Sequence, residues 1–135
     1  MRMKASLLKT EFQRGGVLQS LLLRYTQAQY AFISQNVACN RLHQVDERLA
    51  RWLLLFCERA GSNELLLTHE FISQMLGVRR AGVSETAYRL QKAGLIRYHR
   101  GKLTILNRQA LEAASCSCYG IIKGSYSRLL GTESS

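Results

Sequence analysis

Side chains that can hydrogen-bond to the edges of nucleic-acid bases stand close together in one segment of the sequence, at Arg79, Arg80, Ser84 and Glu85. An arginine can pair bidentately with O6 and N7 of guanine, a glutamate can accept from N4 of cytosine, and a serine is permissive. The spacing places all four on the first turns of a helix predicted to begin near Arg79 or Arg80. Such residues are candidates for reading a base sequence in a major groove.

A second group of residues carries the chemistry of phosphate binding: Thr68, Arg89, Arg100 and Lys102. Thr68 stands at a predicted helix start, where its hydroxyl and free backbone N–H groups can hold a phosphate. Arg100 and Lys102 lie in a predicted hairpin tip, and Arg89 lies further along the base-reading helix. The alternative for Arg89 is an ion pair with Glu85, four residues earlier on that helix.

The charge distribution points to a polyanionic partner. The 135-residue chain has 19 Lys and Arg against 9 Asp and Glu, a formal net charge of +10, which indicates nucleic acid or an anionic membrane surface. Between Met75 and Arg108, eight basic residues accompany one acid, Glu85. This concentration favours a binding face, and the alternative is a solvated face that only maintains solubility.

No apolar run long enough to span a membrane and no secretory signal is present in the sequence, so we expect a cytoplasmic protein.

The remaining reactive residues form no motif that indicates catalysis. Cys39, Cys57, Cys116 and Cys118 contain one C-x-C pair without the second close pair typical of zinc sites, and the three histidines are scattered. We expect reduced thiols, no metal and no cofactor, with a metal or redox site as the minor alternative. Phosphate-cradling glycine loops and the H-E-x-x-H and G-x-S-x-G motifs are absent. The sequence therefore does not predict an enzyme.

The elements that must position these residues form a predicted helix-turn-helix. Thr68 is the expected N-cap of a first helix that ends at Gly77, whose freedom to adopt a positive φ suits the turn. The small Ser73 lets the two helices approach each other. The second helix carries the base-reading residues and runs to about Lys92.

A small β-hairpin is predicted after the second helix. Its strands are the β-type runs 95–98 and 103–106, and the basic, glycine-containing stretch 99–102 forms its tip. Asn107 is the expected cap of a further helix, 108–114. The expected fold class is mainly α with a small β wing, a winged helix-turn-helix preceded by a long dimerisation helix.

The N-terminal part of the chain is predicted to contain helices at 1–13, 17–36 and 38–59. In the second helix, apolar residues recur every three or four positions and form a seam along one face, and further apolar residues lie off that seam. Apolar residues on more than one face suggest that a second copy of the chain packs against this helix. The alternative is an ordinary intramolecular helix. We therefore expect residues 1–37 to serve dimerisation and 38–135 to form the DNA-binding domain, with a homodimer made through Leu18, Leu21, Leu22, Tyr25, Ala28 and Phe32.

Two stretches resemble the Crp/Fnr (catabolite activator) family. "LTHEFISQMLGVRRAGVSETAYRLQKAGLIRYHRGKLTIL" is similar to its C-terminal winged helix, and "LLLRYTQAQYAFISQNVACNRLHQVDERLARWLLL" resembles its dimerisation helix and the helix that follows. The resemblance implies a transcription regulator that binds a two-fold-related site on double-stranded DNA as a homodimer. It also makes RNA polymerase a candidate partner.

The sequence departs from that family in two ways. A strand-rich N-terminal sensor domain is missing, so the chain is expected to be a fragment or a regulator without the sensor, with weak, effector-independent DNA binding. Arg80 matches the family's base-reading arginine, but Ala81 and Gly82 replace a glutamate and a threonine, and Glu85 replaces an arginine of some members. The expected target therefore differs from the best-known family site. The rival interpretation is a winged-helix protein-interaction module without specific DNA readout.

Overall fold

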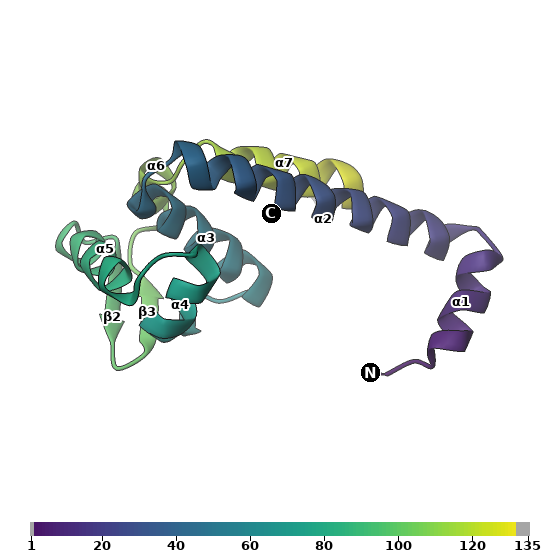
Figure 1. The fold of residues 1–135 in the computed structure, drawn as a ribbon, viewed down its shortest axis with the longest axis horizontal. Coiled ribbons are helices and arrows are strands. Elements are labelled where there is room, and N and C mark those ends of the chain that lie inside the picture. The colour runs from purple at the N-terminus through teal and green to yellow at the C-terminus, as the bar shows by residue number, and fades with distance from the viewer. Residues whose placement is uncertain (1, 132–135) are drawn as a thin grey trace. The chain divides into compact units, whose positions relative to one another are not determined.

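The computed structural model describes residues 2–131 (Figure 1). The chain divides into two compact units, one combining Met1–Asn36 with Ile121–Ser135 and the other formed by Val37–Gly120. In the first unit α1 spans Ala5–Gln13, and it is followed by most of α2, Val17–Leu42. The last helix, α7, spans Cys118–Leu130 and crosses the boundary between the units. Met1 and residues 132–135, the ends of the predicted domains, lie outside the described residues.

The second unit is built around α3, Val45–Ala60, which packs against α4, α5 and α6. These helices span His69–Leu76, Arg80–Lys92 and Arg108–Ala114. Burying each large aliphatic side chain contributes roughly 1.5–3 kcal/mol to stability. The core of the unit consists mainly of such side chains, including Leu49, Leu53, Ile72, Val83, Leu90, Ile96, Leu103 and Leu111.

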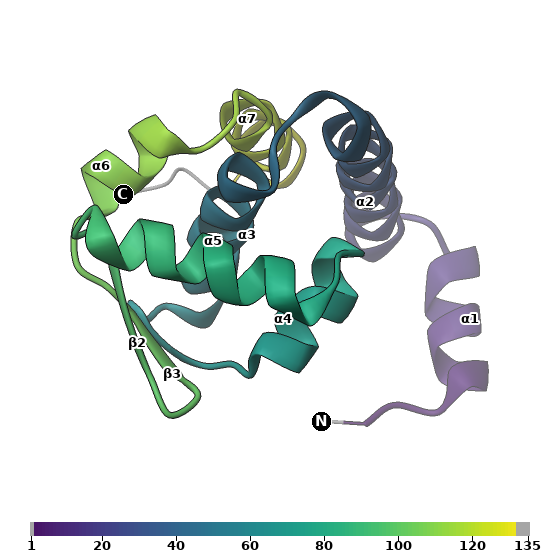
Figure 2. The ribbon, with the colours of Figure 1, turned by 60° about the vertical axis from the view of Figure 1, so that its left-hand side comes forward.

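A three-stranded antiparallel sheet completes the second unit. Its strands are β1, Glu64–Leu66, β2, Ile96–His99, and β3, Lys102–Ile105, in the order β1-β3-β2. Leu103 pairs with Leu65 on one side and with Tyr98 on the other. Figure 2 shows the β2–β3 hairpin projecting beyond the helices. The predicted wing is therefore confirmed, and β1, which directly precedes α4, supplies a third strand.

Three predicted helix ends, at Thr68, Gly77 and Asn107, depend on local interactions and are confirmed. The Thr68 hydroxyl accepts a hydrogen bond from the Phe71 backbone N–H at 3.1 Å, and Asn107 Oδ1 accepts one from the Ala110 N–H at 3.0 Å. Each such cap stabilises its helix by about 0.5–2 kcal/mol. Gly77 ends α4 in the left-handed conformation, φ 64°, which costs glycine little because it has no Cβ.

The predicted boundary between the second and third helices is wrong. We expected a helix to end near Asn36 and another to begin at Ala38, but α2 continues to Leu42 and α3 begins at Val45. No glycine or proline interrupts α2, so nothing local ends it at 36. The break falls where Gln44 is extended and its backbone N–H donates to Glu47 at 2.9 Å. Leu42, the last residue of α2, is 72% exposed.

Candidate nucleic-acid interface

The base-reading candidates lie together on the exposed N-terminal end of α5. Arg79 is its N-cap and Arg80 its first residue, and Ser84 and Glu85 follow one turn later. All four are exposed. Val83, between them, is fully buried and anchors this end of the helix in the core. The side chains are thus held on a rigid element and directed away from the core.

A hydrogen-bonded chain ties this end of α5 to α4. The Ser84 hydroxyl donates to the Arg80 carbonyl at 3.2 Å, and His69 Nδ1 lies 2.8 Å from the same hydroxyl oxygen. Because the hydroxyl proton is used on Arg80, the neutral His69 ring donates from Nδ1. Burial, and then the charge of Arg80, lower the pKa of His69. The lowered pKa favours the neutral form of the ring.

The same histidine also contacts the wing. Its ring stacks on Tyr98 of β2 with centroids 4.3 Å apart and planes at 23°. The Tyr98 hydroxyl donates to the Leu67 carbonyl at 2.9 Å, next to the N-cap of α4. His69 thereby joins α4, α5 and the wing, and the predicted DNA-contacting residues lie on these elements or at their ends.

Six basic residues between α5 and α6 differ in whether a carboxylate already pairs with them. Arg89, Lys102 and Arg108 have carboxylate partners within 4.0 Å. Within residues 2–131, Arg79, Arg80 and Arg100 have none. The sequence alone does not show which of these basic residues form ion pairs, because most of the carboxylate partners are distant in the sequence.

Arg89 is the most constrained of the predicted phosphate-binding residues. Its Nε and Nη2 donate to the two carboxylate oxygens of Asp46 at 2.7 and 2.5 Å, and its Nη1 lies 3.0 Å from Glu85. Bidentate geometry of this kind is the strongest form of the arginine–carboxylate pair. The hydrogen bond from Arg89 lowers the pKa of Asp46. The pairing of Glu85 with Arg89, our alternative from sequence, is formed together with a second acid that spacing did not reveal.

The remaining phosphate candidates differ in what they already contact. The Thr68 hydroxyl accepts from Phe71 and keeps its own proton to donate. Lys102 lies 2.8 Å from Glu64 across the sheet. Arg100 is exposed in the hairpin turn with φ 47°, the one positive φ outside glycine among residues 2–131. Of these three, Arg100 offers its charge without first breaking an ion pair.

The predicted dimerisation residues all lie on α2. Ala28 is fully buried, whereas Leu18, Leu21 and Tyr25 are 36%, 42% and 47% exposed. Leu22 and Phe32 are half-buried. Apolar residues off the seam are more exposed still, with Tyr30 at 74% and Ile33 at 59%.

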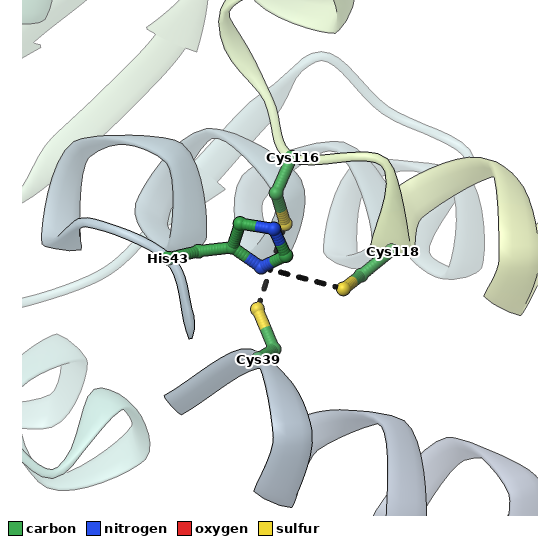
Figure 3. Close-up of side chains that lie close together, drawn as sticks. All are labelled: Cys39, His43, Cys116 and Cys118. Carbon is green, nitrogen blue, oxygen red and sulfur yellow. Dashed lines mark hydrogen bonds between the residues drawn. The ribbon is translucent and has the colours of Figure 1, made fainter. Parts of the chain in front are cut away.

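The fold also brings together four side chains whose spacing in the sequence did not indicate a metal site: Cys39, His43, Cys116 and Cys118 (Figure 3). Their ligand-type atoms all lie within 4.8 Å of one another. The sequence signal was the spacing of Cys39 and His43, four apart on one helical face, combined with the C-x-C pair. Each half is too common to indicate a site, and 77 residues separate Cys39 from Cys116.

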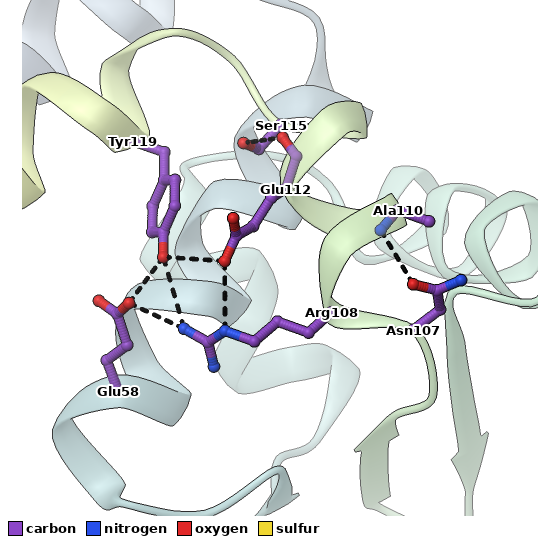
Figure 4. A network of polar contacts seen from close by, with 7 residues as sticks. All are labelled: Glu58, Asn107, Arg108, Ala110, Glu112, Ser115 and Tyr119. Atoms are coloured by element: carbon purple, nitrogen blue, oxygen red, sulfur yellow. Dashed lines mark hydrogen bonds and ion pairs between the residues drawn. The ribbon is translucent and has the colours of Figure 1, made fainter. Parts of the chain in front are cut away.

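A polar network beside this cluster explains one of the basic residues counted above (Figure 4). Arg108 Nη2 lies 2.8 Å from Glu58 Oε1, and its Nε lies 3.2 Å from Glu112 Oε1. The Tyr119 hydroxyl donates to Glu58 at 2.6 Å. The network links α3, α6 and α7, so Arg108 has a structural role and does not belong to the exposed basic face.

The arrangement of α4, α5 and the wing is that of a winged helix-turn-helix. Residues 47–114 match the family of Crp-like helix-turn-helix domains, and the chain belongs to that family. No curated protein matches the sequence at a significant level. Every helix in residues 2–131 is too short or too polar to span a membrane.

Solved structures of regulators share this fold. A protein described as a Crp/Fnr-family transcriptional regulator from Eubacterium rectale is 26% identical with a TM-score of 0.62, over 82% of this chain and 51% of that one. FixK2 from Bradyrhizobium japonicum is 20% identical with a TM-score of 0.75, over 85% and 60%. A CRP-family regulator from Thermus thermophilus is 21% identical with a TM-score of 0.53, over 74% and 47%. The chain thus spans about half to three fifths of the first two.

Proposed function

We propose that the chain is a transcription regulator that binds double-stranded DNA in a sequence-specific manner, with the N-terminal end of α5 in the major groove. The observation that carries the proposal is the pair Arg79 and Arg80, exposed at the start of α5 without a carboxylate partner among residues 2–131. An exposed arginine that pairs with no carboxylate of its own chain can bind a base or a phosphate of DNA. Membership of the Crp-like helix-turn-helix family supports the same function. The role is one of binding, without catalysis.

Individual contacts follow from what each side chain already does. Arg80 is the first choice for bidentate pairing with guanine, with Arg79 beside it. Ser84 and Glu85 are base-reading candidates that must adjust existing bonds to His69 and Arg89. Thr68 and Arg100 are expected to bind phosphates directly. Arg89 and Lys102 can do so only by exchanging Asp46 and Glu64 for the DNA.

We infer that the DNA is bound by a homodimer formed through α2, on a site with two-fold symmetry. A helix with Leu21, Tyr25, Tyr30 and Ile33 exposed presents apolar side chains on more than one face, and burying them against a second copy removes them from water. The division into a dimerisation part, residues 1–37, and a DNA-binding part, 38–135, remains a prediction, as do RNA polymerase contact, effector-independent binding and a cytoplasmic location.

The proposal is tested by selection from random duplexes at two salt concentrations, with Arg80→Ala and Lys92→Ala in parallel. Lys92 is an exposed residue in the last turn of α5, so Lys92→Ala removes the same charge from the opposite end of the helix. The expected result is a two-fold-symmetric site for the wild type and Lys92→Ala that is lost or relaxed in Arg80→Ala. Absence of binding at both salt concentrations would favour a protein-interaction module instead.

A further inference from the structure

The cluster of Cys39, His43, Cys116 and Cys118 has the composition of a metal site (Figure 3). The three thiols are 0%, 4% and 2% exposed, and His43 is half-buried beside them. Thiolate and imidazole are the ligands preferred by zinc in structural sites, where a Cys₃His set is one of the common combinations. All four residues belong to the second unit.

The elements present the four ligand atoms to one point. Cys39 and His43 are one turn apart at the C-terminal end of α2, where the His43 N–H still donates to the Cys39 carbonyl at 3.0 Å. Cys116 lies between α6 and α7, and Cys118 begins α7, so both come from the opposite end of the unit's sequence. Cys39 Sγ lies 3.5 Å from Cys116 Sγ, and Cys118 Sγ lies 3.5 Å from His43 Nδ1.

These distances suit a single tetrahedral ion. With zinc–sulfur and zinc–nitrogen bonds of about 2.3 and 2.0–2.1 Å, tetrahedral ligand atoms lie about 3.6–3.8 Å apart. The four atoms here are all within 4.8 Å of one another, so small side-chain adjustments place an ion at their centre. An iron–sulfur cluster needs ligands spread around several irons, and this set is too compact for one.

We propose that Cys39, His43, Cys116 and Cys118 bind one structural Zn²⁺ ion that joins the segment leading into the winged helix to the segment leading out of it. Zn²⁺ replaces the three thiol protons, which are released to solvent, and the imidazole binds through Nδ1. Four protein ligands leave no open position, so the ion is structural and not catalytic. The proposal goes beyond DNA binding and does not depend on it.

The electrostatic surroundings favour this assignment. Three thiolates and one neutral imidazole on Zn²⁺ carry a net charge of −1. The guanidinium of Arg51 is 2% exposed, and its positive charge acts on the thiols of Cys39 and Cys116. A buried cation beside an anionic metal centre is the compensation that a low-dielectric interior requires.

Metal content and cobalt spectroscopy of the full chain test the proposal. We expect about one zinc per chain after purification under reducing conditions without chelator, or after reconstitution with Zn²⁺. Co²⁺ in its place should give thiolate-to-metal charge-transfer bands and the intense visible bands of a tetrahedral site. Cys116→Ala and His43→Gln should lose most of the metal, whereas Cys57→Ala, a buried cysteine outside the cluster, should retain it.

A rescue variant separates ligand loss from misfolding. His43→Cys supplies a fourth thiolate, so it should still bind one Co²⁺, with absorption shifted toward that of a four-sulfur site. Wild type without metal after reconstitution, metal content unchanged in Cys116→Ala, iron with acid-labile sulfide, or a Cys39–Cys116 disulfide in the reduced preparation would each overturn the proposal.

Discussion

The start of α5 and the junction of α3, α6 and α7 use arginine in opposite ways. At the junction Arg108 is surrounded by Glu58, Glu112 and Tyr119. At the start of α5, Arg79 and Arg80 have no carboxylate partner within residues 2–131. An arginine that pairs with carboxylates of its own chain stabilises the fold. An exposed arginine without such a carboxylate can instead bind DNA. Net charge alone does not distinguish them.

The largest expected effect is that of removing the proposed zinc from Cys39, His43, Cys116 and Cys118. A ligand present at about a thousand times its Kd stabilises the folded state by about 4 kcal/mol. A strong chelator should therefore lower Tm by many degrees, and excess Zn²⁺ should restore it, as measured by calorimetry. The Arg80→Ala variant should respond to the chelator as the wild type does. An unchanged Tm after addition of the chelator would contradict the proposed structural zinc site.

The next largest effect is expected from Arg108→Ala. The substitution leaves Glu58, Glu112 and the Tyr119 hydroxyl near one another without their shared donor, which should cost about 1–3 kcal/mol in the free energy of unfolding. Urea denaturation measures it. The DNA affinity of the folded fraction should stay unchanged. A loss of affinity without a loss of stability would place Arg108 on the binding face after all.

Arg89 lies between the two kinds of region, and Arg89→Ala should produce a smaller loss of stability. Its pair with Asp46 is partly solvent-exposed, with side chains 47% and 35% accessible, and water and salt weaken such pairs. A double-mutant cycle with Asp46→Ala should show a coupling that accounts for most of the loss. Independent, additive effects of the two substitutions would mean that the pair contributes nothing.

The smallest expected effect is the pH dependence due to His69. Burial and the charge of Arg80 lower the pKa of His69 in the folded protein, so the unfolded chain binds its proton more readily. The His69 contribution to stability is therefore complete above a pH of about 6.5 and is lost as the pH falls through the folded-state pKa. Subtracting the unfolding free energies of His69→Gln from those of the wild type across this range should show that slope. A flat difference would contradict it.

What the sequence predicted correctly depends on local interactions. Thr68, Gly77 and Asn107 form hydrogen bonds with residues at most four positions away in the sequence. Their residue types are therefore enough to predict where the helices begin or end. The start of α3 was missed because the bond from Gln44 to Glu47, and not a glycine or proline, sets it. The Asp46–Arg89 pair spans 43 residues and the Cys39–Cys116 contact 77. No spacing rule links such positions, so only the fold could show which arginines and cysteines are engaged.

The central claim is that Arg79 and Arg80, which have no carboxylate partner among residues 2–131, read DNA bases, whereas the ion-paired Arg89 does not. The direct test is fluorescence anisotropy with the selected duplex and a scrambled duplex, for the wild type, Arg80→Ala and Arg89→Ala at matched salt. Arg80→Ala should lose about 1–3 kcal/mol of discrimination between the two duplexes, while Arg89→Ala should keep the wild-type discrimination. Equal loss of discrimination in both variants, or none in Arg80→Ala, would contradict the claim.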